Sequence, residues 1–81
     1  MELDKDIAIE GFLLRQIKVA SETECGLRCS QHRTCVSFTV QQPGSPGLKI
    51  CELNTVSAKS HPESVVRRKG FQYYELANIF Y

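Results

Sequence analysis

Residues 21–35 read SETECGLRCSQHRTC, and this stretch decides the fold. Its first four residues form a capping box. The Ser21 hydroxyl can accept from the Glu24 backbone N–H, while the Glu24 carboxylate can accept from the Ser21 N–H. Acidic residues in the first turn also suit the helix dipole. The pattern therefore predicts a helix that begins after Ser21 and runs to about Gln31.

The predicted helix carries two cysteines on one side. Cys25 and Cys29 are four residues apart and share a helix face, which we expect to point at a sheet. Gly26 lies between them and costs the helix about 1 kcal/mol relative to alanine. A glycine at this position suggests that another element approaches the helix closely.

The segments around this helix have the composition of β-strands. Residues 12–19 are rich in large apolar residues, and residues 35–41 alternate apolar with polar positions, which predicts a half-buried strand. A turn at residues 43–47 joins the latter to a strand over residues 49–54, so the two form a hairpin. The aromatic-rich residues 70–76 predict a closing strand. The expected fold class is α+β, an antiparallel sheet with a single helix packed across it.

The remaining segments show weaker patterns. Residues 1–10 are charged and predict an N-terminal arm or the lead-in to a strand. Residues 54–69 are polar and predict a long loop with room for one helical turn after Pro62. We accordingly expect a domain over residues 11–77 and a tail over residues 78–81.

Length and charge limit the possible functions. A chain of 81 residues forms one domain, and a core of this size is marginal without further links. The net charge is +1, from 10 basic and 9 acidic residues, whereas a nucleic-acid-binding domain is normally clearly basic. No apolar stretch approaches the roughly 20 residues needed to cross a bilayer. We therefore expect neither nucleic-acid binding nor membrane insertion.

The four cysteines are the expected links. An even number of cysteines in a short chain predicts a disulfide framework in an oxidising compartment. Three pairings are possible, and Cys25–Cys51 with Cys29–Cys35 fits the local geometry best. This pairing ties the helix to both strands of the hairpin. Two disulfides are thus part of the expected fold.

Other uses of the cysteines are less well supported. The spacing of Cys25 and Cys29 suits a structural zinc site, to which His32 and His61 could contribute, but no second cysteine pair has such a spacing. A catalytic thiolate would need an activating base beside it, and His32 is better explained as a loop or helix-end residue. We therefore predict no metal site, no cofactor and no enzymatic activity.

The sequence resembles the PAN/apple superfamily over about residues 12–76. The resemblance is carried by Ser21-x3-Cys25-x3-Cys29, Cys35-x-Ser37-Phe38, Cys51-x-Leu53 and Tyr73-Tyr74. It implies a sheet that cradles one helix, together with the same two disulfides. Many apple domains have a third bridge that joins the domain ends, which this chain lacks, so it is similar to the four-cysteine PAN form. The resemblance also implies an extracellular binding module for proteins or carbohydrates, within a larger secreted or cell-surface protein.

Candidate binding residues come from two features. The first is a set of basic side chains, which together could bind a sulfated glycan. The second is the aromatic pair of the closing strand, where we expect Tyr73 to be buried with Phe71 and Tyr74 to lie on the other face, available for recognition. The candidate ligand-binding residues are Lys59, His61, Arg67, Arg68, Lys69 and Tyr74.

Two functions follow from these candidates. The first is protein–protein interaction, in which the loops over residues 42–48 and 54–69 supply contacts on a rigid scaffold. The alternative is a carbohydrate-binding module for a heparin-like glycan, which would use the basic residues. The simpler explanation of those basic residues is that they lie on a solvent-exposed face and bind nothing. The identity of the ligand and the oligomeric state do not follow from the sequence.

Overall fold

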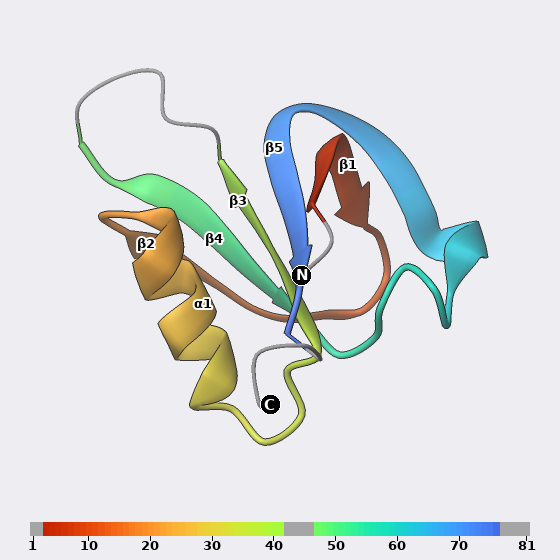
Figure 1. Cartoon of the computed structure of the whole chain (residues 1–81), viewed down its shortest axis with the longest axis horizontal. Helices are drawn as coiled ribbons and strands as arrows, with labels where there is room; N and C mark the ends of the chain where they lie inside the picture. The colour runs from red at the N-terminus through yellow and green to blue at the C-terminus, as the bar shows by residue number, and fades with distance from the viewer. Residues whose placement is uncertain (1–2, 42–46, 77–81) are drawn as a thin grey trace.

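The computed structural model describes residues 3–41 and 47–76. In this part of the chain, one α-helix lies across an antiparallel five-stranded sheet with strand order β1-β5-β3-β4-β2 (Figure 1). The strands are β1 (Leu3–Ile9), β2 (Leu13–Val19), β3 (Ser37–Gln41), β4 (Lys49–Asn54) and β5 (Val65–Glu75). The helix is α1 (Glu22–Ser30), and a 3₁₀ turn, η1 (Pro62–Ser64), precedes β5. This architecture confirms the expected α+β class.

Helix α1 begins at the predicted cap. The Ser21 hydroxyl accepts from the Glu24 N–H at 3.2 Å. The Glu24 carboxylate accepts from the N–H of Ala20 at 2.9 Å, one residue earlier than the capping-box pattern predicted. The helix ends at Ser30, where Gln31 is the C-cap. The Ser21 side chain thus satisfies one of the unpaired N–H groups at the start of the helix, and the Glu24 side chain fixes the residue that precedes the cap.

The two cysteines of α1 point at the sheet and bond as expected. Cys25 is joined to Cys51 of β4, with 5.6 Å between their Cα atoms. Cys29 is joined to Cys35, just before β3, with 5.3 Å between their Cα atoms. The two bridges fix the helix to both strands of the β3–β4 hairpin. With four sulfur atoms in disulfides, no thiolate is left for zinc or for nucleophilic catalysis.

Strands β1 and β5 differ from the expectation. Residues 3–9 form a sheet strand rather than a loose arm, and residues 65–69 continue β5 rather than a loop. The two segments explain each other, because Ile9 pairs with Val65 and Ala8 with Val66. Neither segment has a strong strand pattern alone, so their pairing was not visible in the sequence. The predicted helical turn after Pro62 is present as η1.

Strand β5 bends near its middle, so that its first half lies over the face of the sheet opposite α1. The β1–β5 register jumps from Lys5 opposite Gln72 to Ile7 opposite Arg67. At the jump, Asp6 and Gly70 both have positive φ, of 59° and 89°, and the Gly70 N–H donates to the Asp6 carboxylate at 2.9 Å. Glycine adopts this backbone conformation without strain. Figure 1 shows β5 turning sharply beside β1 at this bend.

The two faces of the sheet bury different side chains. Beneath α1 lies the main apolar cluster, built around Val40, Leu53 and the disulfides. On the opposite face, Ser37 and Thr39 of β3 are both 0% exposed. The expectation of a half-buried strand at residues 35–41 was therefore wrong, because the bent half of β5 and the loop before it cover the second face.

Candidate functional site

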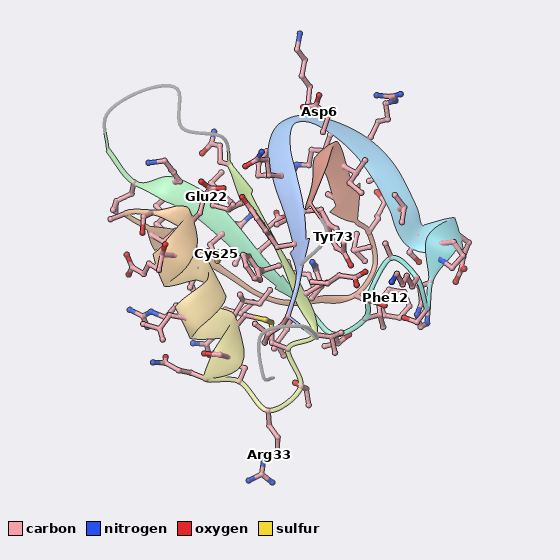
Figure 2. The ribbon with its side chains drawn as sticks, viewed as in Figure 1. Asp6, Phe12, Glu22, Cys25, Arg33 and Tyr73 are labelled. Carbon is pink, nitrogen blue, oxygen red and sulfur yellow. A yellow bond between two sulfur atoms is a disulfide. The ribbon has the colours of Figure 1, made fainter. Side chains whose placement is uncertain are left out.

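A groove lies between α1 and the end of β5. Its volume is about 510 Å³, within the roughly 300–1,000 Å³ of typical ligand sites. The walls are formed by residues of α1 and by Leu76, and the floor is formed by side chains of β3 and β5. Most of the lining surface is apolar. Figure 2 shows Glu22 at the helix end that forms one rim.

The floor of the groove is a pair of stacked aromatic rings. Phe38 of β3 and Tyr74 of β5 have ring centroids 5.1 Å apart and an interplanar angle of 14°. Gly26 of α1 lies directly over Phe38, since a Cβ atom at this glycine would lie 3.1 Å from the Phe38 Cζ. The close approach predicted from Gly26 is thus confirmed. A glycine here lets the helix sit against the floor while the groove stays open beside it.

The hydroxyl of Tyr74 connects the floor to the helix. It donates to the Glu22 carboxylate in the first turn of α1, and the Gln72 Oε1 lies 3.1 Å from the same hydroxyl. Burial, together with the hydrogen bond to Glu22, raises the pKa of Tyr74 to about 12. Tyr74 therefore remains a neutral donor across the physiological pH range. Its ring is held by stacking on Phe38 and by the hydrogen bond from its hydroxyl to Glu22.

The rims of the groove combine apolar and polar groups. Leu27 projects from α1 with 56% of its surface exposed, although it lies beside the aromatic floor. Glu22, Thr23 and Ser30 supply the polar part of the rim. Such a site can accept an apolar group on its floor and a hydrogen-bonding or cationic group at its edge.

Arg68 is held within the protein and is not a free cation. Its guanidinium lies 2.6 Å from the Glu52 carboxylate of β4 and 4.0 Å from the centre of the Phe71 ring. Gln16 of β2 donates to the other oxygen of the Glu52 carboxylate at 2.9 Å. The arginine thus links the bent half of β5 to β4, and Glu52 continues the link to β2. This contact gives it a structural role in addition to any role in binding.

The other candidate cations do not form one cluster with the groove. Arg67 and Lys69 are exposed on β5, in a strand rather than in the expected loop, and Lys59 is exposed in the loop before η1. The His61 ring packs at 4.7 Å from the ring of Phe12. Figure 2 shows Phe12 near η1 and Asp6 at the bend of β1 beside β5. None of these cations lines the groove.

Tyr73 lies on the opposite face of the sheet and is fully buried, as expected. Its hydroxyl accepts from the Ala58 N–H at 2.7 Å and donates to the Glu75 carboxylate at 2.9 Å. Burial is the largest cause that raises the pKa of Tyr73 to about 12, with a further contribution from Glu75. Phe71 is also buried. Of the aromatic residues of β5, Tyr74 alone lines the groove.

Sequence reasoning found part of this site. Tyr74 was a candidate, and Gly26 was recognised as a point of close approach. Glu22 and Leu27 were missed as groove residues, because the capping pattern accounted for the first and a single exposed leucine is ordinary on a protein surface. Among the described residues, no group of three or more His, Cys, Asp or Glu side chains could hold a metal ion.

The fold and its disulfides agree with one protein family. The family model of the PAN domain matches residues 5–79. The chain belongs to the PAN domain family. PAN domains are binding modules for proteins or carbohydrates rather than enzymes. The match begins at residue 5, within β1.

Two other comparisons add nothing to the family assignment. No curated protein and no solved structure matches the chain. Among the helices that the structure describes, none has the length and apolar character needed to cross a membrane.

Proposed function

We propose that this PAN domain is a protein-binding module of a secreted or cell-surface protein, and that the groove between α1 and β5 is its contact surface. An extracellular setting is supported by the two disulfides, because such bonds persist mainly in oxidising compartments. The proposal includes no catalytic role.

The observation that carries this proposal is the exposed apolar groove itself. Leu27 would lose its water contact on binding, and the Phe38–Tyr74 pair offers an aromatic floor beside it. A few anchor residues that fill well-packed pockets, most often aromatic residues and arginine, carry most of the binding energy of protein interfaces. Two disulfides hold α1 against the sheet, so the groove is formed before a partner arrives, and little ordering entropy opposes binding.

A heparin-like glycan is the alternative ligand. It is supported by the exposed Arg67 and Lys69, which lie two residues apart on β5. It is weakened by Arg68, which is already paired with Glu52. The loop over residues 42–48, a predicted contact segment, falls mainly outside the described residues. Half of the loop expected over residues 54–69, namely residues 62–69, is folded into η1 and β5.

A peptide selection tests the proposal. The oxidised domain, with its bonds verified by intact mass before and after alkylation, would be used to select binders from a random-peptide display library. We expect selected peptides to lose binding to a Leu27→Gln domain and to keep binding to a Leu48→Gln domain, since Leu48 is also exposed but lies away from the groove.

Two results would contradict the proposal. Peptides that bind the Leu27→Gln domain as well as the unchanged domain would place the contact surface elsewhere. Salt-sensitive retention on a heparin column, abolished by Arg67→Ala with Lys69→Ala, would favour the glycan alternative if no groove-dependent peptide were found.

A further inference from the structure

The groove has an uneven distribution of charge. Of the described residues that line it, Glu22 alone is charged. The neighbouring Glu24 is already engaged, with the Ala20 N–H at 2.9 Å and with Arg28 at 3.8 Å. Among the side chains that the structure describes, in residues 6–41 and 47–76, no cation lies within salt-bridge distance of Glu22. The groove therefore presents one negative charge at one end of an apolar floor.

The position of this charge is fixed by the floor. Tyr74 stacks on Phe38 through its ring and reaches Glu22 through its hydroxyl, so the carboxylate lies at the hydroxyl end of the stacked Tyr74 ring. In an extended peptide, side chains on the same side are about 6–7 Å apart, at residues i and i+2. A segment of this kind can place one side chain on the floor and the next at Glu22.

We propose that the groove selects an extended peptide segment in which an aromatic or large aliphatic residue is followed or preceded, at the second position, by arginine or lysine. This inference rests on the proposed protein-binding function and deepens it. The apolar side chain would lie beside Leu27 on the aromatic floor. The cation would meet the Glu22 carboxylate at the rim, where a charge pair contributes more to selectivity than to affinity.

A titration with three defined peptides tests the selectivity. The probes are Ac-Arg-Ala-Phe-Ala-Arg-NH2 and its two relatives with glutamine or glutamate in place of both arginines, so that either chain direction is sampled. Each would be added to the ¹⁵N-labelled oxidised domain while amide chemical shifts are followed. We expect shifts centred on Thr23, Gly26, Leu27 and Leu76.

The order of affinities carries the inference. The arginine peptide should bind about two- to fivefold more tightly than the glutamine peptide, as expected for a partly exposed charge pair, and the glutamate peptide should bind most weakly. High salt should reduce the difference. Glu22→Gln should make the arginine and glutamine peptides equal, whereas Glu63→Gln, an exposed carboxylate of η1, should leave the preference intact.

The possible failures can be told apart. Equal binding of all three peptides in the groove would overturn the charge selectivity and leave protein binding standing. No groove shifts with any peptide would overturn both. If Phe80→Ser moves the amide shifts of the groove residues without any peptide, the groove is occupied by the chain's own residues 77–81, and the inference is overturned.

Discussion

The face of the sheet beneath α1 and the opposite face are stabilised by different chemistry. Under the helix, apolar side chains pack around two disulfides. On the opposite face, polar groups are buried and pair with one another: Glu52 accepts from Arg68 and Gln16, and Glu75 accepts from Tyr73. Among the described residues, no buried side-chain nitrogen or oxygen lacks a hydrogen-bond partner. The polar face is therefore satisfied, although it is sensitive to the loss of any one partner.

The two faces therefore have different roles: the helix face forms the groove, and the polar face only stabilises the fold. The disulfides and the contact of Gly26 with Phe38 fix the helix on the first face, and the groove opens beside that contact. The polar network on the second face holds the bent half of β5 in place. Substitutions on the helix face should thus affect both stability and the groove, whereas those on the polar face should affect stability without changing the groove.

The largest expected effect is the loss of the disulfide between Cys25 and Cys51. Its sequence separation is 26, against 6 for the Cys29–Cys35 bridge. Chain-entropy estimates give about 3.5 kcal/mol for the longer loop and about 2.4 kcal/mol for the shorter one. Urea unfolding of the two double alanine variants should show the Cys25/Cys51 variant to be less stable by about 1 kcal/mol. Equal losses would show that loop length does not govern the stability of the helix face.

The polar face should lose stability at alkaline pH, as should the groove floor, where the pKa of Tyr74 is raised to the same value. The pKa of Tyr73 is raised from 10.0 to about 12 in the folded state, so the buried neutral phenol stabilises the fold below pH 10, and this contribution is lost as the pH rises toward 12. We expect the unfolding free energy to fall by about 2 kcal/mol for this residue between pH 9 and pH 11.5, measured by urea titration. Tyr73→Phe should reduce that pH dependence. A pH profile unchanged by Tyr73→Phe would assign the alkaline loss to another group.

The two faces also differed in how far the sequence predicted them. The helix, its cap, the disulfide pairing and the hairpin all depend on local signals, and they were predicted correctly. The pairing of β1 with β5 depends on a contact between distant segments, and neither segment carries a strong period. Without knowledge of that pairing, the sequence could only predict that the Ser37 and Thr39 side chains face solvent. The groove itself was not predicted: Tyr74 was a candidate for recognition, Gly26 marked a close approach to the helix, and Glu22 was explained by capping alone.

A smaller effect is expected from Gly26→Ala on the helix face. Alanine would gain about 1 kcal/mol in helix propensity. Its Cβ, however, would lie 3.1 Å from the Phe38 Cζ, and Phe38 is stacked against Tyr74 and cannot easily move away. Overpacking of this kind typically costs about 1–3 kcal/mol, so we expect a net loss of about 1 kcal/mol in urea unfolding.

The matched control for Gly26→Ala is Thr23→Ala. Thr23 is exposed on the same helix, and alanine there should stabilise the domain by about 0.5 kcal/mol. If Gly26→Ala stabilised the domain to a similar extent, the helix would not sit tightly on the aromatic floor, and the groove would be less rigid than described.

The smallest expected effect on stability is the difference between Arg68→Ala and Arg67→Ala on the polar face. Arg68→Ala removes the ion pair with Glu52 and the contact with Phe71, but the Arg68 side chain is 39% exposed, so the expected loss is only about 1 kcal/mol. Arg67→Ala, on the neighbouring exposed residue, should change the stability by no more than about 0.5 kcal/mol. Thermal unfolding of the two variants, each compared with the unchanged domain, would measure both. If neither substitution changed the stability, Arg68 would be as available as Arg67 for binding a polyanion. The glycan alternative would then be strengthened.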